Sequence, residues 1–311
     1  MIYTVSLNPS IDYILRVDRF VEGDLNRAVY DKKIPGGKGI MVSKLLKNLG
    51  IDSVNIGFLG GFPGEFIRKE IEKLGIEENF TKVEEDTRIN VKLKSQKESE
   101  INAQGPNISQ REREEFLNII NSIEKGDMVI LSGSIPKSLN RDFYIDIIKI
   151  LKKNNVTFII DTSGEVLLES LKYNPYLIKP NIHELSEVFD VDLKDYKEII
   201  PYGKKCLELG SENVIVSMGK DGAMFFNKEN IYYAPVVEGK LVNSVGAGDS
   251  MIGGFMTGIS NNLSYKDSFK LAVASGTATA FSEDIGSRED IENIYKKVKI
   301  IELVGEEENG N

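Results

Sequence analysis

The stretch KGIMVSKLLKNLGIDSVNIGFL, residues 38–59, decides the fold class because two kinds of periodicity meet in it. Four apolar residues, starting at Val42, recur at the i, i+3, i+4, i+7 spacing of one helix face, and Gly50 supplies a stop. The run SVNIGFL, which begins at Ser53, is short and apolar, as expected of a buried strand. The stretch therefore predicts a helix followed directly by a strand.

The same alternation continues along the chain. Further apolar runs that predict buried strands begin at Ile2, Asp127, Val156, Pro175 and Asn213. A second amphipathic helix is expected from Arg141, and the pattern after Gly246 is mostly helical. Alternating strands and helices favour an α/β fold with a mostly parallel sheet that helices cover on both faces.

Two half-polar regions, at about residues 11–34 and 87–104, interrupt this alternation. Both are strand-like with one polar face, which is typical of antiparallel strands exposed to water on one side. We expect them to form a small β-sheet lid on a single domain that spans residues 1–311.

Composition and charge exclude several classes of function. The net charge is −9 and no basic cluster is present, so nucleic acid is not an expected partner. No apolar run approaches the roughly 18 residues of a membrane span, and no leader pattern is seen, so we expect a cytoplasmic protein. A lone His183 excludes histidine-rich metal sites and Ser-His-Asp hydrolysis. We expect Cys206 in the core, His183 at the surface or a helix start, and the acidic tail 304–310 to be a solvated end.

The stretch VGAGDSMIGGF, residues 245–255, places its smallest residues around Asp249 where a helix is expected to begin. The first backbone N–H groups of a helix have no partner within the helix, and glycines let an anion approach them closely. An anion site beside a carboxylate suits phosphoryl transfer, in which the acid accepts a proton from an attacking hydroxyl. An acid that caps the helix would also explain Asp249, so this motif alone leaves both interpretations open.

A second glycine cluster, PGGKGIMVSK at residues 35–44, opens the helix described first. The pattern G-x-x-x-x-G-K-[ST] occurs nowhere, so this is no Walker A loop. The segment could bind a phosphate or sugar through its amides, with Lys38 as a point charge. The alternative is a glycine turn with a solvated lysine.

Four further segments carry weaker signals. Asp12 follows the first strand, at the end where α/β proteins bind ligands, although it could be an ordinary turn residue. Arg88, Asn90 and Lys92 share one face of a predicted strand, which could equally be a solvated face.

Asn181 and Glu184 lie where a strand enters a helix. Glu184 could reach a metal–phosphate complex or simply favour the helix start. Residues 217–223, SMGKDGA, read as a strand, a tight turn and a strand, which turn chemistry alone explains as a hairpin.

Taken together and in order, these motifs resemble the ribokinase-like (PfkB-type) sugar kinase family from residue 1 to about residue 290. The resemblance rests on LNPSID, GGKG, TRINVKL, SGSIPK, DTSG, KPNIHEL, VSMGKDGA and VGAGDSMIGG. Within the family, the chain is most similar to the bacterial kinases that phosphorylate fructose 1-phosphate. The resemblance implies an α/β core with a β-sheet lid, and ATP and Mg²⁺ as co-substrate and metal.

The resemblance also implies roles for individual residues. Asp249 would be the catalytic base, and the amides of Gly246, Ala247 and Gly248 would form the anion hole. On the sugar side the implied residues are Asp12 and Asn90, Gly37 and Gly39 through their backbone, and Arg27, Lys38 and Arg88 as candidates for the substrate's phosphate. On the nucleotide side they are Ser217, Met218, Gly219, Lys220, Asp221, Gly222 and Gly248, with Asn181 and Glu184 organising Mg²⁺ through water.

One residue departs from the family pattern. The family's loop commonly reads G-G-K-G-x-N-V, and this chain has Met41 where the sugar-binding Asn is expected. We expect phosphorylation of fructose 1-phosphate at its 6-hydroxyl to give fructose 1,6-bisphosphate. A tagatose-6-phosphate kinase and a non-catalytic sugar-phosphate-binding protein are the alternatives. A homodimer through the lid is plausible.

Overall fold

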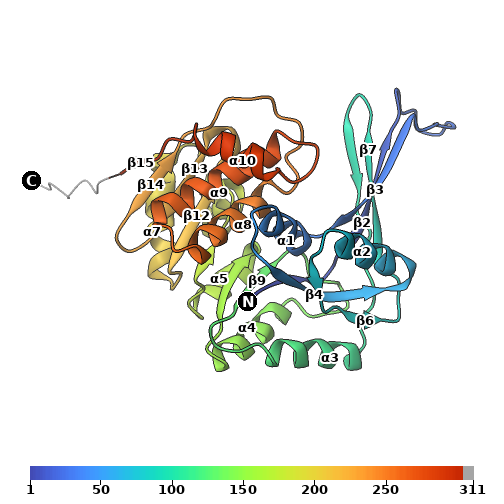
Figure 1. Cartoon of the computed structure of the whole chain (residues 1–311), viewed down its shortest axis with the longest axis horizontal. Helices are drawn as coiled ribbons and strands as arrows, with labels where there is room; N and C mark the ends of the chain where they lie inside the picture. The colour runs from blue at the N-terminus through green and yellow to red at the C-terminus, as the bar shows by residue number, and fades with distance from the viewer. Residues whose placement is uncertain (304–311) are drawn as a thin grey trace, which may run out of the picture.

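A computed structural model describes residues 1–303 of the chain. Its centre is a large sheet in the order β15-β14-β13-β12-β11-β10-β9-β1-β4-β5 (Figure 1). The strands that run parallel in its middle are β1 (Ile2–Ser6), β4 (Ser53–Gly60), β9 (Met128–Ser132), β10 (Thr157–Asp161), β11 (Leu177–Ile178) and β12 (Asn213–Ser217). Each contains or lies within an apolar run predicted from the sequence, so the predicted α/β class is confirmed.

Short strands extend both edges of this sheet. At one edge, β13 (Ala223–Phe226), β14 (Ile231–Ala234) and β15 (Ile301–Glu302) continue from β12 in antiparallel order. At the other, β5 (Glu77–Glu78) and β6 (Thr81–Val83) pair with β4. The hairpin expected around residues 217–223 is therefore present as β12 and β13.

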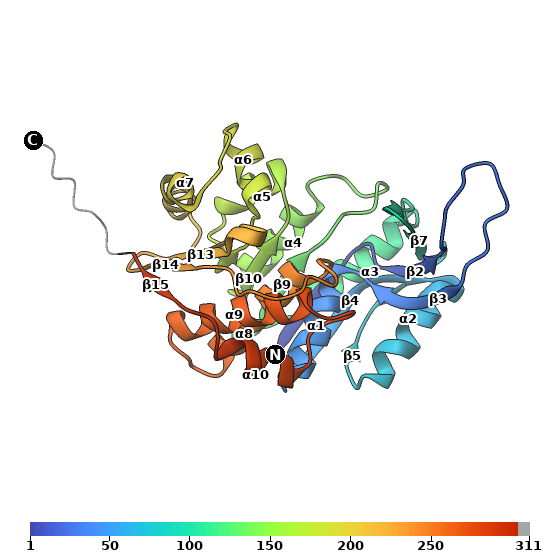
Figure 2. The same cartoon turned by 90° about the horizontal axis from the view of Figure 1, so that it is seen from above.

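Helices cover both faces of the sheet, as Figure 2 shows. One face carries α1 (Lys38–Asn48), α8 (Ala247–Ser260), α9 (Tyr265–Ala280) and α10 (Arg288–Tyr295). The other carries α3 (Gln110–Asn121), α4 (Phe143–Lys153), α5 (Gly164–Leu171), α6 (Ile182–Phe189) and α7 (Tyr196–Glu208). The apolar stripe of α1 packs through Leu45 and Leu46, which are fully buried. This packing fixes the start of α1 above the carboxyl end of β1.

The lid is a separate four-stranded sheet in the order β3-β2-β7-β8, which projects from the core in Figure 1. Its strands are β2 (Ser10–Arg16), β3 (Tyr30–Gly36), β7 (Arg88–Lys94) and β8 (Glu98–Ile101), and α2 (Gly61–Lys73) packs beneath it. The pairs β2–β3 and β7–β8 are antiparallel, as expected. The contact between the two insertions, β2–β7, is parallel, which corrects the expectation of an antiparallel lid. Both strands leave the same edge of the parallel core sheet, so they run outward in the same direction.

The remaining single residues lie as predicted where the structure describes them. Cys206 is buried in the core, and burial raises the pKa of its thiol to about 12. His183 is exposed in the first turn of α6. Among residues 1–303, no helix is long and apolar enough to cross a membrane. The acidic tail at 304–310 lies outside the described residues.

Candidate active site

A polar cavity of about 320 Å³ lies between the lid and the carboxyl ends of the core strands. Its wall combines the segment after β1, the start of α1, the loop after β9, the lid strands and the start of α8. Of the predicted site residues, the structure brings Asp12, Gly37, Lys38, Arg88, Asn90 and Asp249 to this cavity. Segments distant in sequence therefore converge where an α/β sheet binds ligands.

The start of α8 brings Asp249 to the cavity, whereas the predicted anion-hole residues Gly246, Ala247 and Gly248 are not among its lining residues. Gly246 is the N-cap and has φ 79°, a left-handed conformation that favours glycine. Asp249 therefore stands at the third helical position, and no side chain caps this helix. The interpretation of Asp249 as a helix cap is thus wrong. Its carboxyl group does not cap the helix and lies beside the N–H groups of the first turn, where it can act on a ligand.

The carboxyl group of Asp249 is buried and charged groups surround it. Only 7% of the residue is exposed. Burial, followed by the negative charge of Asp161, raises the pKa of Asp249 to about 7, while Lys38 and Lys179 oppose that shift. A carboxylate with a pKa near neutrality can accept a proton more readily than an ordinary aspartate.

Asp161 holds two lysines behind this carboxylate. Lys38 Nζ lies 3.0 Å from Asp161 Oδ2, and Lys179 Nζ lies 3.2 Å from Asp161 Oδ1. Burial alone would raise the pKa of Asp161, but the charges of Lys179 and Lys38 hold it below its usual range. The sequence analysis assigned no role to Asp161 or Lys179. Asp161 is the last residue of β10 and Lys179 directly follows β11, and a charged residue at the carboxyl end of a predicted strand is the signal that could have identified each of them.

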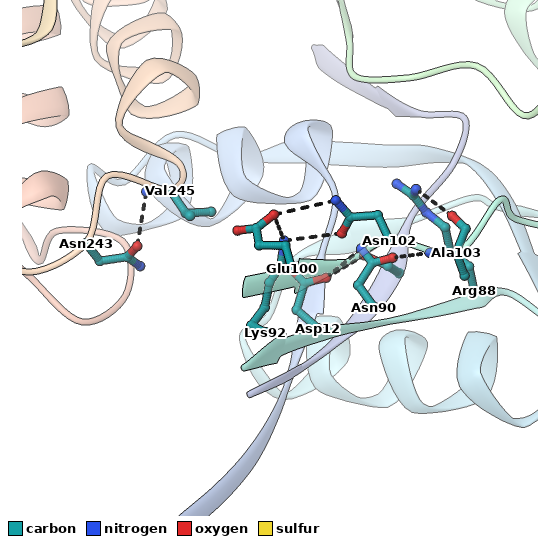
Figure 3. A network of polar contacts seen from close by, with 10 residues as sticks. Asp12, Arg88, Asn90, Lys92, Glu100, Asn102, Ala103, Asn243 and Val245 are labelled. Atoms are coloured by element: carbon teal, nitrogen blue, oxygen red, sulfur yellow. Dashed lines mark hydrogen bonds and ion pairs between the residues drawn. The ribbon is translucent and has the colours of Figure 1, made fainter. Parts of the chain in front are cut away.

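The lid contributes a hydrogen-bonded group around Asp12 (Figure 3). Asp12 Oδ1 accepts hydrogen bonds from Ser10 Oγ at 2.8 Å and from Asn90 Nδ2 at 3.0 Å. Asn90 Oδ1 accepts from the Ala103 N–H at 3.1 Å, which ties β7 to the segment after β8. This network fixes the direction of the Asp12 carboxylate in the cavity wall, where it can accept hydrogen bonds from sugar hydroxyls.

Two further cations line the cavity from β7. The guanidinium group of Arg88 donates to the carbonyl oxygens of Asn8 and Ala103 at 2.8–3.1 Å. Lys92 Nζ lies 2.6 Å from Glu100 Oε2 (Figure 3), and its hydrogen bond lowers the pKa of Glu100. Arg88 has N–H groups left for an anion. Because Glu100 neutralises Lys92, Arg88 is the cation of the lid wall that has no carboxylate within ion-pair distance among residues 1–303.

The structure separates two predicted sugar-site residues from the cavity. Gly39 does not line it, because a Cβ on Gly39 would lie 2.5 Å from the carbonyl oxygen of Val5. Glycine is required there so that α1 can pack closely on β1. Arg27 lies exposed in the loop between β2 and β3, also outside the cavity lining.

Met41 lies in the cavity wall with 6% of its surface exposed, as does the more exposed Val245. These residues form an apolar section of an otherwise polar wall. Ser6 Oγ, Asn8 Oδ1 and Ser132 Oγ are buried lining atoms with no hydrogen-bond partner within residues 1–303. None of these three residues was predicted from the sequence as a site residue, and they add polar atoms that a ligand could satisfy.

The predicted nucleotide and metal segments lie next to each other, outside the cavity lining. Ser217 forms a parallel bridge with Asn181, and residues Gly219–Asp221 form a 3₁₀ turn. Asn181 Oδ1 accepts from the His183 and Glu184 N–H groups, and Glu184 Oε2 accepts from the Asn181 N–H. Asn181 and Glu184 thus form a capping box for α6, and Glu184 Oε1 has no hydrogen-bond partner among the described residues.

Comparison with known proteins identifies similar sequences over nearly the whole chain. The pfkB family carbohydrate kinase model matches residues 5–291. A Bacillus subtilis 1-phosphofructokinase is 50% identical over 303 residues, covering 97% of this chain and 100% of the relative. A Staphylococcus epidermidis tagatose-6-phosphate kinase is 34% identical over 310 residues, with 97% and 100% covered.

The fold comparison agrees with the sequence comparison. The crystal structure of a putative phosphofructokinase from Staphylococcus aureus superimposes with a TM-score of 0.89 at 44% identity. It covers 98% of this chain and 100% of that chain, so the lid and the core are both included in the similarity.

Proposed function

Because the chain belongs to the pfkB family of carbohydrate kinases, we propose that it transfers the γ-phosphoryl group of ATP to the 6-hydroxyl of fructose 1-phosphate. The product is fructose 1,6-bisphosphate. The observation that carries the mechanism is the buried Asp249 carboxyl group, with a pKa of about 7, beside the first-turn amides of α8 in a polar cavity.

The relatives favour fructose 1-phosphate over tagatose 6-phosphate. The relative named for 1-phosphofructokinase activity is 50% identical, and the one named for tagatose-6-phosphate kinase activity is 34% identical. Met41 occupies one section of the cavity wall, and Asp12, Asn90 and Asp249 line the same cavity.

In the proposed mechanism, the sugar lies between the lid and the core with its 6-hydroxyl facing Asp249. The Asp249 carboxylate accepts the hydroxyl proton while the oxygen attacks the phosphorus. The N–H groups of Gly246, Ala247 and Gly248 stabilise negative charge on the transferring group. Ala247 N–H also makes a long 3.4 Å hydrogen bond to the Ser244 carbonyl, so Gly246 and Gly248 are the less encumbered donors.

The substrate's own phosphate needs positive groups at the other end of the cavity. Arg88 is fixed by backbone carbonyls and keeps further N–H groups for an anion. Lys38 lines the same cavity with 42% of its side chain exposed, while its ammonium group contacts Asp161. Arg27 would reach this phosphate only if its loop moved or a second chain presented it.

The nucleotide is proposed to lie along Ser217–Gly222, next to Asn181. Mg²⁺ usually keeps several waters and takes one or two carboxylates together with substrate phosphates. Within residues 1–303, no group of three or more His, Cys, Asp or Glu side chains is arranged to hold a metal ion. The single available oxygen of Glu184 fits an indirect, water-mediated role, and the bound ion would neutralise charge on the nucleotide phosphates.

The lid also exposes apolar side chains that suit a homodimer. Leu25, Val29 and Ile101 are 76%, 60% and 66% exposed, and β3 and β8 are unpaired edge strands. We expect Leu25→Glu and Ile101→Glu to reduce the mass measured by light scattering from dimer to monomer. Leu209→Glu, on the distant end of α7, is the control. A monomeric wild-type protein would contradict the dimer.

The function is tested by ADP release with Mg-ATP and fructose 1-phosphate, tagatose 6-phosphate or fructose 6-phosphate in parallel. We expect fructose 1-phosphate to give the highest kcat/KM. A preference for a 6-phosphate sugar would agree with phosphoryl transfer but contradict fructose 1-phosphate as the substrate. Binding of sugar phosphate without turnover of any sugar would favour the non-catalytic alternative.

A further inference from the structure

Three charged groups lie behind the Asp249 carboxylate, and the proposed mechanism gives a role to only one of them, Lys38. Lys38 comes from α1, Lys179 follows β11, and Asp161 ends β10. Asp161 is 2% exposed and Lys179 is 5% exposed, so neither group can exchange its partner for water. Burying paired charges has a large desolvation penalty, and removing one partner leaves an uncompensated buried charge.

The two lysines pair with Asp161 and not with Asp249. Each ammonium group contacts a different oxygen of Asp161, at 3.0 Å for Lys38 and 3.2 Å for Lys179. Within residues 1–303, the Asp249 carboxyl group takes part in no ion pair and no side-chain cap. Asp249 nevertheless lies close enough that the charges of Asp161, Lys38 and Lys179 all act on it.

We propose that Asp161 is a positioning residue for phosphoryl transfer: it keeps the ammonium groups of Lys38 and Lys179 on its own two oxygens, so that no lysine forms an ion pair with Asp249 and its carboxylate stays a proton acceptor. This inference rests on the proposed function, because it concerns the base of that reaction. A carboxylate that formed a direct ion pair with a lysine would be a weaker base.

The ammonium group of Lys179 also contributes positive charge to the start of α8. A Cβ on Gly248 would lie 3.0 Å from Lys179 Nζ, so this ammonium group lies directly against the first turn of α8. It therefore adds a full positive charge where the helix amides supply only partial ones. Asp161 fixes that charge beside the amides, and within residues 1–303 neither lysine forms an ion pair with Asp249.

The other charged groups that line the cavity lie on the lid. They are Asp12 on β2 and Arg88 and Lys92 on β7. Outside the cavity lining, the charge of Glu184 on α6 also acts on Lys38. Asp12 is held by Ser10 and Asn90, and Lys92 by Glu100, so each has a partner of its own. The charge state of Asp249 is consequently governed most directly by the group at Asp161.

The test uses two substitutions that should shift the titration midpoint of Asp249 in opposite directions. Asp161→Asn removes the partner of both lysines, so their charges stabilise the Asp249 carboxylate and its titration midpoint falls. Lys179→Met removes one cation, so the midpoint rises. For charge partners at this range we expect shifts of about 1 pH unit or more. The readout is the carboxyl ¹³C resonance of Asp249 in the ligand-free enzyme, assigned by its loss in Asp249→Asn.

The kinetic readout is the acidic limb of the kcat–pH profile with fructose 1-phosphate, which should move in the same directions. Asp146→Asn, which breaks the Arg113–Asp146 pair between α3 and α4, is the matched control and should move neither readout. Unchanged midpoints, shifts of the same sign in both variants, or an equal shift in the control would overturn the proposal. If Asp161→Asn does not fold, the shift of the Asp249 titration midpoint in Lys179→Met alone tests the proposal, and an unchanged or lowered midpoint overturns it. A wild-type enzyme without turnover would refute the kinase function, and the ¹³C titration would still test the charge arrangement.

Discussion

The ammonium group of Lys179 occupies the space beside Gly248, where a Cβ would lie 3.0 Å from Nζ. This relationship explains why a glycine stands at the second helical position of α8, where other small residues would suit a helix better. Because Gly248 has no side chain, the ammonium group of the buried Lys179 lies next to the exposed backbone of the first turn of α8.

Gly248→Ala should therefore separate stability from activity. Alanine favours a helix over glycine by about 1 kcal/mol, and the flexible end of Lys179 can shift to make room. We expect an unchanged or raised Tm together with a fall in kcat of about 10-fold to 100-fold, below the loss typical of a deleted oxyanion donor. Thermal melting and steady-state rates measure both. A kcat equal to that of the wild type would show that the approach of Lys179 to the backbone does not matter.

Asp249→Asn should stabilise the protein in a pH-dependent way. The pKa of this carboxyl group is about 7 in the folded state and lower in the unfolded chain, so the folded state binds more protons. Its contribution to stability is present at low pH and is lost as the pH rises toward 7. The Tm difference between variant and wild type should grow from about pH 4 to pH 7 and then level off. A constant difference across that range would contradict the raised pKa.

Lys38→Met should affect the sugar phosphate more than the nucleotide. Loss of a charged hydrogen bond costs about 1.5–3 kcal/mol, so we expect KM for fructose 1-phosphate to rise at least 10-fold. KM for ATP should change by less than about 3-fold if only the sugar end is touched. Lys44→Met, which removes the Lys44–Asp284 pair on the same helix, is the control. Equal increases in both KM values would argue against the assignment of Lys38 to the sugar phosphate.

Asn90→Ala should weaken sugar binding through Asp12. The substitution removes a 3.0 Å hydrogen bond to Asp12 and leaves the Ala103 N–H without its partner. Each lost hydrogen bond costs about 0.5–1.5 kcal/mol, so both the Tm and the affinity for fructose 1-phosphate should fall. Calorimetric titration with the sugar phosphate measures the second effect. Asn107→Ala, which breaks an exposed contact with Glu85, should leave that affinity unchanged.

The elements that local periodicity determines could be predicted from the sequence. The helix of residues 38–48 and the strand from Ser53 each carry their own apolar pattern, and the structure has both. The helix start at Gly246 was predictable because the glycines precede an apolar stripe. The direction of β7 against β2 was not, because that pairing joins two insertions and depends on where the core sheet releases each strand.

Some residues of the candidate site could likewise be predicted from the sequence, and others could not. Asp249, Asp12 and Asn90 stand in short motifs that the family resemblance assigns to the site, and the structure brings them to one cavity. Asp161 and Lys179 each look like the polar end of a strand, and only the neighbouring order of β10 and β11 brings them together. Gly39 shows the opposite case, since its motif suggests ligand contact whereas the fold requires it for packing.

The most direct test of the central claim is a single-turnover transfer from γ-³²P-labelled ATP to fructose 1-phosphate by wild-type enzyme and Asp249→Asn. Loss of a general base typically costs about 10²–10⁴-fold in rate. We predict label in fructose 1,6-bisphosphate with the wild type and a rate at least 100-fold lower in a folded variant. Label appearing only as inorganic phosphate, or a variant within a few-fold of the wild type, would contradict Asp249 as the base of a fructose 1-phosphate kinase.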